Sequence, residues 1–185
     1  MEASRKDYFP KFEHLGNATP YVERIHKIVE HIRLFEDFER SEIAFIAPYL
    51  ACYRAPGGAT IIGEGDPGDF MLLILDGSVE IVKIDKDSGF PVRVGVAGPG
   101  KVLGEMSLVD GEPRFASCLA LEQTLFALLD RDTLSQVITD EPRIGIKVLM
   151  QLIVLLNQRL RLVSSELMHY LGGVKPAQQA PGIAP

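Results

Sequence analysis

The chain contains 185 residues, with 19 basic and 25 acidic side chains and a formal net charge of −6. This length predicts one domain with extensions and is enough to bury a core without disulfides or metals. The negative charge argues against broad nucleic-acid binding, which needs a basic face, but it permits one small anion in a local positive pocket.

Cysteine and histidine usage narrows the class of protein further. Cys52 and Cys118 are the two cysteines and lie in strand-like contexts, so we expect buried free thiols in a reducing compartment. The four histidines have no metal-ligand spacing, and no metal site is expected. The first residues lack the pattern of a signal peptide, and the densest apolar run, residues 148–156, is too short to cross a bilayer. We therefore expect a soluble cytoplasmic protein with no membrane contact.

The first fifty residues are predicted to hold a flexible segment and two helices. Residues 1–19 are polar and irregular, and we expect a flexible N-terminus there. Residues 20–50 form the predicted N-terminal helical region. Apolar side chains recur at helical spacing over 21–33, and a second helix fits 41–50, with Ser41 as its N-cap.

Glycine and proline divide residues 51–140 into short strands. The continuously apolar run 70–75 predicts a strand that is buried on both faces. Residues 76–77 predict a hairpin turn, residues 86–89 another turn, and residues 98–100 the end of a strand. The predicted fold is α+β: a double-stranded β-helix, or jelly-roll-like β-roll, with N-terminal helices and a long C-terminal helix.

A short helix is expected over 132–138 and a long one over 141–171. On the long helix, one apolar stripe, the seam, alternates steps of three and four residues: Ile146, Leu149, Ile153, Leu156, Leu160, Val163, Leu167 and Tyr170. Such a seam predicts a homodimer through a parallel coiled coil. A second stripe is predicted to face the protomer's own strands: Val148, Leu152, Leu155 and Leu162. The alternative is a single broad apolar face packed against one domain.

Residues 104–117 combine a Gly-Glu pair at the start of a short helical turn with an arginine nine residues after the glutamate. These parts suit a cyclic phosphodiester fused to a ribose. The helix N-terminus and the Arg114 guanidinium attract the phosphate, whereas ionised Glu105 accepts a hydrogen bond from a sugar 2′-hydroxyl. Gly104 lets the backbone approach closely. The alternative is a surface loop with an ordinary Glu–Arg ion pair.

This segment resembles the phosphate-binding cassette of the cyclic nucleotide-binding domain family, which includes bacterial catabolite activator proteins, kinase regulatory subunits and cyclic-nucleotide-gated channels. The resemblance extends from about Leu34 to about Leu171. Outside the cassette it rests on these residues: Leu34-Phe35, Glu42-Ile43, Ile61, Glu64-Gly65-Asp66, Gly68-Asp69, Ile74, Gly77-Ser78-Val79, Gly98-Pro99-Gly100 and Asp130-Arg131. It implies the same β-roll and a cyclic nucleotide as the ligand.

The resemblance also implies where the nucleotide binds. The cyclic phosphate is expected on backbone amides around Ser107 and Ala116, with Arg114 across it. On the long helix, Ser164 lies one heptad after Asn157, so both are placed to reach the ligand, or else they are solvated flank residues. The full predicted ligand-binding set is Gly104, Glu105, Met106, Ser107, Arg114, Phe115, Ala116, Ser117, Asn157 and Ser164.

Base selection depends on Phe115. In kinase-type domains that prefer cGMP, a threonine at this position bonds the guanine amino group, and a phenyl ring cannot. The resemblance therefore implies cAMP as the ligand in preference to cGMP. The ring either lies against the base or points into the core. The Ser117 hydroxyl likewise faces either the ligand or the strand.

Residues 172–185 begin with Gly172-Gly173, a helix stop, and continue with proline and glycine, so we expect a disordered tail. This stretch is too short for the winged helix-turn-helix of the family's transcription factors. We therefore expect a free-standing sensor domain without direct DNA binding.

These features predict a non-enzymatic cAMP sensor that signals allosterically to a protein partner, whose identity the sequence does not reveal. The chain shows no nucleophile–base pair typical of an enzyme, and no cofactor besides the ligand is expected. Two alternatives stay open. One is a scaffold dimer with a degenerate pocket. The other is a cyclic dinucleotide sensor, which would need a second guanidinium from Arg93, Arg159 or Arg161.

Overall fold

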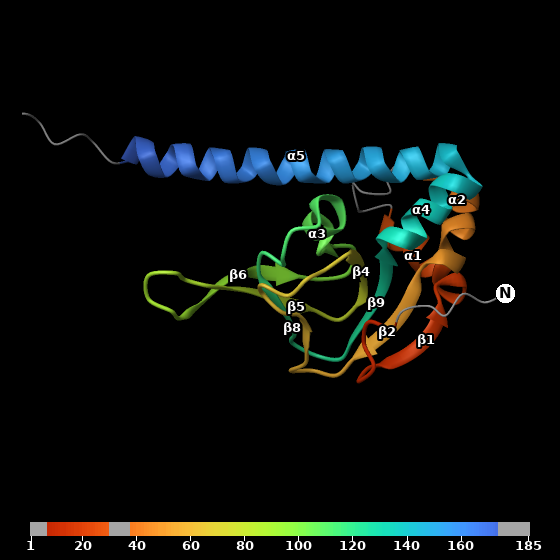
Figure 1. The fold of residues 1–185 in the computed structure, drawn as a ribbon, viewed down its shortest axis with the longest axis horizontal. Coiled ribbons are helices and arrows are strands. Elements are labelled where there is room, and N and C mark those ends of the chain that lie inside the picture. Colours follow the sequence, from red (N-terminus) through yellow and green to blue (C-terminus); the bar gives the residue numbers. More distant parts are fainter. Residues whose placement is uncertain (1–6, 30–37, 174–185) are drawn as a thin grey trace, which may run out of the picture.

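Two antiparallel sheets and a long C-terminal helix make up the computed structural model, which describes residues 7–29 and 38–173 (Figure 1). The five-stranded sheet has the order β1 (Glu13–Asn17), β2 (Ala51–Ala55), β9 (Thr124–Asp130), β4 (Phe70–Asp76) and β7 (Val102–Leu103). The four-stranded sheet has the order β3 (Thr60–Ile62), β8 (Ser117–Ala120), β5 (Val79–Ile84) and β6 (Pro91–Ala97). This arrangement confirms the predicted α+β fold with a β-roll.

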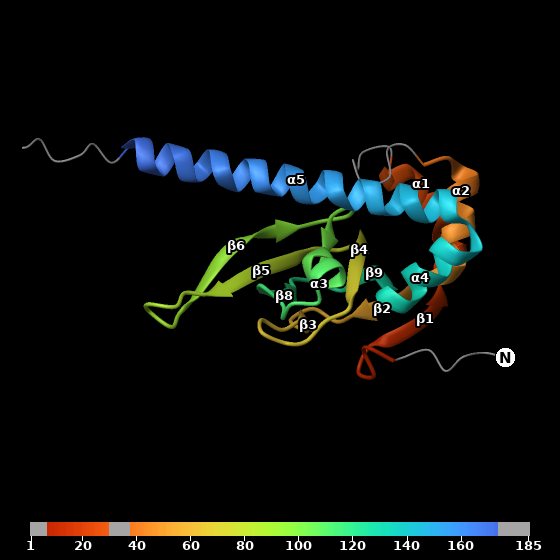
Figure 2. The ribbon, with the colours of Figure 1, turned by 45° about the horizontal axis from the view of Figure 1, so that its top comes forward.

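The helices flank the sheets on one side and at one end. Near the N-terminus lie the short 3-10 helices η1 (Thr19–Tyr21) and η2 (Ala47–Tyr49) and the α-helices α1 (Val22–Val29) and α2 (Arg40–Ile46). Later in the chain come α3 (Glu105–Asp110), α4 (Arg131–Asp140) and α5 (Pro142–Gly173). In Figures 1 and 2, α1, α2 and α4 gather at one end of the molecule, and α3 lies beneath the middle of α5.

The core has two layers, and β4 contributes to both. Met71, Leu73 and Leu75 point into a cluster shared with the helices, whereas Phe70, Leu72 and Ile74 point into a cluster between the sheets. Successive side chains of a strand alternate between its faces, so a strand covered on both sides must be apolar throughout. The predicted doubly buried strand over residues 70–75 is therefore confirmed.

The turn at residues 76–77 differs from the predicted hairpin. β4 pairs with β9 and β7, while the following β5 pairs with β6 and β8, so this turn carries the chain from one sheet to the other. Gly77 has a φ of 82°, and an added Cβ would lie 2.6 Å from the Gln123 carbonyl oxygen. The prediction of a hairpin was wrong. The residues of a turn determine that the chain reverses its direction, but they do not determine which strands the two flanking strands pair with. Residues 86–89 do join paired strands, β5 and β6.

The N-terminal region differs from expectation in two details. Residues 13–17, expected to be irregular, form β1 and pair with β2. The N-cap of α2 is Glu39 and not Ser41, and the Glu39 N–H donates to the Glu42 carboxylate at 2.7 Å. The predictions for residues 30–37, including Leu34-Phe35, and for the tail after Gly173 fall outside the described part of the chain.

The first half of α5 is packed against the rest of the molecule. Ile144, Val148 and Leu152 are buried in the cluster shared with the sheet and helices. An added Cβ at Gly145 would lie 2.6 Å from the Ile138 Cα, so only glycine permits this contact between α4 and α5. The Lys147 ammonium pairs with the Glu42 carboxylate at 2.6 Å and ties α5 to α2.

The second half of α5 extends beyond the helices, as both views show (Figure 2). Of the stripe predicted to face the strands, Val148 and Leu152 are buried and Leu155 is half-buried, but Leu162 is 65% exposed. Leu162 was wrongly assigned because this part of α5 has no strand or helix of the protomer against it. The members of the seam, apart from half-buried Leu156, are exposed.

Neither a membrane-spanning helix nor a metal-binding cluster is found among the described residues. No helix among them combines the length and apolar character needed to cross a bilayer. Within residues 7–29 and 38–173, no group of three or more His, Cys, Asp or Glu side chains is gathered as a metal site would require. Cys52 and Cys118 are buried free thiols, as predicted.

Candidate functional site

A cavity of about 90 Å³ lies where α3, the loop before β8 and α5 come together. Seven of the ten predicted ligand-binding residues line it: Gly104, Glu105, Met106, Ser107, Arg114, Phe115 and Ala116. Ser117, Asn157 and Ser164 do not. The cavity is completed mainly by apolar side chains and by Arg159: Ile62, Ile81, Leu103, Cys118 and Arg159.

Gly104 shapes the start of α3. Its φ of 76° lies in the left-handed region, and an added Cβ would be 2.6 Å from Arg114 Nη1. Glycine alone adopts this conformation without strain and leaves room for the guanidinium. The sequence predicted that Gly104 lets another group approach the backbone closely. In the structure the group that does so is the Arg114 side chain.

Arg114 is only 4% exposed. Its Nη1 donates to the carbonyl oxygens of Phe70 at 2.8 Å and Gly104 at 2.9 Å, and its guanidinium lies 4.1 Å from the centre of the Phe70 ring. Its Nη2 is buried and forms no hydrogen bond with the described residues. Burial lowers the pKa of Arg114, yet a guanidinium remains charged in proteins. The result is a buried cation with one donor group unused.

Glu105 is its acidic counterpart, 1% exposed at the first position of α3. Oε1 forms an ion pair with Arg159 of α5, while Oε2 is buried without a hydrogen-bond partner among the described residues. Burial raises the pKa of Glu105, and the Arg159 charge opposes that change. Arg159 Nη2 also donates to the Val102 carbonyl oxygen at 2.7 Å. α5 therefore contacts the site directly through one side chain.

The two serines of the cassette have different surroundings. Ser107 is buried and lines the cavity. The Ser117 hydroxyl accepts a hydrogen bond from the Glu64 N–H at 2.9 Å, so it faces the loop between β3 and β4. Of the two orientations that the sequence left open for Ser117, the structure has the one away from the cavity.

Phe115 is 57% exposed at the cavity, so its ring does not point into the core. The Lys83 ammonium lies 4.3 Å from the ring centre and donates to the Phe115 carbonyl oxygen at 2.6 Å. Lys83 also pairs with Glu64 at 2.7 Å. The ring is therefore held at the surface beside the cavity, where a bound base could contact it.

Arg131 fixes the other end of α3. Its Nε donates to the Leu108 carbonyl oxygen, and its Nη2 to those of Ser107 and Leu108, at 2.9–3.1 Å. The Gly111 N–H also donates to the Ser107 carbonyl oxygen at 3.0 Å. Carbonyl groups at a helix C-terminus lack partners within the helix, and a guanidinium satisfies several at once.

The sequence suggested Arg159 only as one of three arginines that could supply the second guanidinium that a cyclic dinucleotide would require. It did not predict the contact of Arg159 with Glu105. A signal was available in the stripe that faces the strands. Val148, Leu152 and Leu155 follow helical steps of four and three, and the next step of four reaches position 159. Asn157 and Ser164 lie elsewhere around α5 and are exposed.

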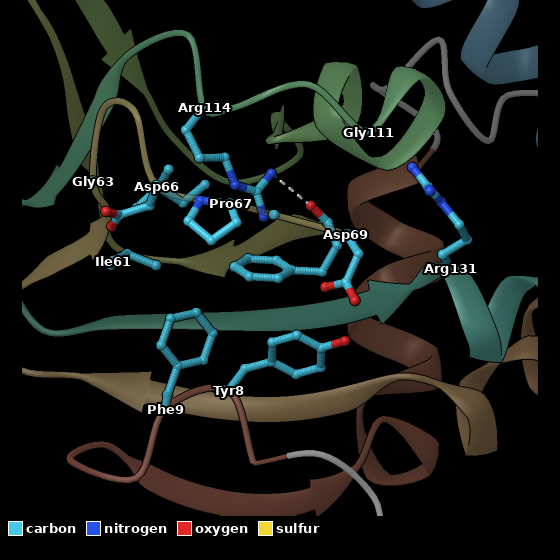
Figure 3. Close-up of a pocket in the computed structure, with 13 residues that line it drawn as sticks. Tyr8, Phe9, Ile61, Gly63, Asp66, Pro67, Asp69, Gly111, Arg114 and Arg131 are labelled. Carbon is cyan, nitrogen blue, oxygen red and sulfur yellow. Dashed lines mark hydrogen bonds between the residues drawn. The ribbon is translucent and has the colours of Figure 1, made fainter.

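A second and larger cavity of about 500 Å³ lies on another side of Arg114 (Figure 3). Figure 3 shows Arg114 on one side of this cavity and Tyr8 and Phe9 on the opposite side, with Asp69 and Arg131 at one end. Its size exceeds that of the cassette cavity, but it contains neither Glu105 nor the N-terminal end of α3. The smaller cavity is therefore the candidate nucleotide site.

Comparisons with known proteins agree with this fold. Residues 54–141 match the cyclic nucleotide-binding domain family. A cyclic nucleotide-binding domain from Methylobacillus flagellatus is 39% identical, with a TM-score of 0.79 over 95% of this chain and 96% of that chain. The chain belongs to the cyclic nucleotide-binding domain family, whose members are typically non-catalytic binding domains.

Longer regulators share part of their length with this chain. The CRP-like cAMP-activated global transcriptional regulator of Mycobacterium tuberculosis is 32% identical over 141 residues, which cover 76% of this chain and 61% of that protein. The catabolite activator protein of Thermus thermophilus is 31% identical, with a TM-score of 0.67 over 73% of this chain and 61% of that one. The chain thus spans about three fifths of the length of these regulators.

Proposed function

We propose that this protein binds a cyclic mononucleotide, cAMP in preference to cGMP, and acts as a non-enzymatic sensor for a protein partner. One observation carries the proposal: a buried cation and a buried anion line the same cavity, and each has one polar atom without a hydrogen-bond partner among the described residues. Burial of an unsatisfied polar group costs about 1–3 kcal/mol, so a ligand that satisfies both atoms is favoured.

A cyclic nucleotide has the complementary groups. Its cyclic phosphate is an anion that accepts hydrogen bonds, which suits Arg114 Nη2. Its ribose 2′-hydroxyl donates a hydrogen bond, which suits Glu105 Oε2. A non-cyclic ligand with a free 2′-hydroxyl would bring a more highly charged phosphate close to the Glu105 carboxylate, which disfavours it.

The size of the cavity supports a change of conformation on binding. Sites for small molecules usually have volumes of about 300–1,000 Å³, and this cavity has about 90 Å³. We expect the ligand to widen it, and Arg159 of α5 lies in its wall, paired with Glu105. A ligand that binds the wider state more tightly shifts the population toward it, and α5 transmits the shift.

The preference for cAMP rests on Phe115. This residue offers its exposed ring to a base and has no hydroxyl to bond the guanine amino group. Relatives with cAMP in their names, the mycobacterial regulator and the cAMP-dependent protein kinase regulatory subunit of Yarrowia lipolytica, support the same ligand. The kinase subunit is 29% identical, and the chain covers 30% of its length.

Calorimetric titration with four nucleotides tests the proposal. We expect low-micromolar binding of cAMP, equivalent to about −8 kcal/mol, with cGMP and 5′-AMP weaker. 2′-Deoxy-cAMP is expected to bind at least about tenfold more weakly because Glu105 Oε2 stays unsatisfied. Absence of binding in protein shown to be free of carried-over nucleotide would contradict the proposal and favour a scaffold with a degenerate pocket.

A cyclic dinucleotide added to the same series addresses the other alternative. It would need a second guanidinium, but Arg159 is already paired with Glu105, and Arg93 is paired with Glu80 at 3.1 Å. We therefore expect no binding of cyclic di-AMP or cyclic di-GMP. Binding of either one without binding of cAMP would replace the proposed ligand.

We also propose that the seam of α5 forms a homodimer. The seam side chains other than Leu156 are exposed, so they form a face of the helix that the described segments leave uncovered. Leu160→Glu is expected to convert a dimer to a monomer, because it buries a carboxylate in the coiled coil. Leu162→Glu, on an exposed position outside the seam, is the matched control and should remain dimeric. Sedimentation velocity distinguishes the two, and a monomeric wild type or a dimeric Leu160→Glu variant would contradict the proposal.

A further inference from the structure

Phe70 contacts the proposed phosphate-binding arginine in two ways. Its carbonyl oxygen accepts a hydrogen bond from Arg114 Nη1 at 2.8 Å, and its ring centre lies 4.1 Å from the guanidinium. Both side chains are buried. The attraction between a cation and the face of an aromatic ring is strongest where water is excluded. Phe70 therefore provides a specific surface on which the guanidinium rests.

The N-terminal arm, residues 7–12, packs against the same phenylalanine. The Tyr8 and Phe9 rings both pack edge-to-face with the Phe70 ring. The distance between ring centres is 4.9 Å for Tyr8 and 5.5 Å for Phe9. The centre of the Phe9 ring also lies 5.2 Å from that of Tyr53 and 5.3 Å from that of Phe126, so the arm is anchored in the core between the sheets. Figure 3 shows these two rings across the larger cavity from Arg114.

Carboxylates on more than one side of Arg114 attract its guanidinium. Burial lowers the pKa of Arg114, and the charge of Glu105 opposes that change, as do those of Asp69 and Asp66. Both also line the larger cavity, on the side away from Glu105. The contact with the Phe70 ring opposes movement of the guanidinium toward these two carboxylates.

We propose that Phe70 is a positioning residue that holds Arg114 in place for the cyclic phosphate, and that the N-terminal arm holds Phe70. This inference rests on the proposed function for its effect on nucleotide affinity. The N-terminal arm lies outside the nucleotide cavity. Through its contact with Phe70, and through the contact of Phe70 with Arg114, it would nevertheless influence nucleotide affinity.

The test varies the electron density of the ring without changing its packing. Phe70 is replaced in full-length protein by phenylalanines with one, two and three ring fluorines, which progressively weaken attraction to a cation. We expect the Kd for cAMP to rise stepwise, by about tenfold over the series. The matched control is the same series at Phe126, which is fully buried, also touches Phe9, and has no cation–π contact among the described residues. Equal effects at both positions would overturn the proposal in favour of packing alone.

A second measurement follows Arg114 without any nucleotide. The Arg114 Nε–H resonance in protein with ¹⁵N-labelled arginine, assigned with Arg114→Lys, is expected to move when Phe70→Leu removes the ring current. Tyr8→Leu and Phe9→Leu should move it less, in the same direction. An unchanged resonance would overturn the proposal. If the resonance follows the ring but no variant or wild type binds cAMP, the hold of Phe70 on Arg114 is supported and the proposed function is the part that fails.

Discussion

Arg114→Lys is expected to weaken cAMP binding by about 100-fold, because lysine keeps the charge but not the planar fork of donors. In the structure Nη1 donates to two carbonyl oxygens, whereas Nη2 has no hydrogen-bond partner in the described part of the chain. A lysine ammonium cannot bond the Phe70 and Gly104 carbonyls and a phosphate oxygen with the same geometry. Calorimetric titration of the variant beside wild type gives the change directly.

The control for this variant is Arg93→Lys. Arg93 is an exposed arginine of β6 whose Nε pairs with Glu80 at 3.1 Å, and it does not line the cassette cavity. Its replacement should leave the Kd for cAMP unchanged. Thermal unfolding of Arg114→Lys is recorded in parallel, because two carbonyl groups lose their donor at a cost of about 1–3 kcal/mol each. A folded Arg114→Lys variant that binds cAMP as wild type does would remove Arg114 from the site.

Leu152→Ala is expected to lower the free energy of unfolding by about 2–5 kcal/mol. Leu152 is 1% exposed, in the cluster that joins α5 to the five-stranded sheet and to α2 and α4. Its truncation leaves a cavity at the place where α5 is attached to the β-roll. Because Arg159 lies two turns further along the same face, loosened packing there should also weaken cAMP binding. Denaturant-induced unfolding measures the stability change.

The matched control is Val154→Ala, two residues away on an exposed position that belongs to neither apolar stripe. Its free energy of unfolding should stay within about 0.5 kcal/mol of wild type. Both variants are measured at several protein concentrations, since dimerisation makes apparent stability depend on concentration. Equal losses for Leu152→Ala and Val154→Ala would contradict the assignment of Leu152 to the attachment of α5.

Together these contacts place α5 at the centre of the proposed response. Its first half is fixed by buried side chains and by the Lys147–Glu42 pair, and its Arg159 enters the candidate site. Its opposite, exposed face carries the seam along both halves. A ligand that competes with Arg159 for Glu105 would therefore act on the same helix that we propose as the dimer interface.

Features that depend on local order along the chain were predictable. The apolar run of β4 must be buried on both faces. The order Gly104, Glu105, Arg114 by itself also fits a surface ion pair, and it was the resemblance of the surrounding chain to a known family that favoured a ligand site; the structure brings the three residues to one cavity. The seam of α5 follows from helical periodicity alone, since 3.6 residues per turn set which side chains share a face. Whether the cassette residues bind nucleotide stays a prediction.

Other features depended on which segments meet in space. The turn at 76–77 links two sheets because strand pairing is decided by distant strands, β9 and β8, and not by the turn itself. Leu162 is exposed because no other described segment packs against it, and Arg159 reaches Glu105 because α3 lies beneath the middle of α5 (Figures 1 and 2). Helical periodicity contains neither fact. The contact of Phe70 with both Arg114 and the N-terminal arm likewise joins residues far apart in sequence. Such contacts arise from long-range packing, which a local pattern of residue types does not encode.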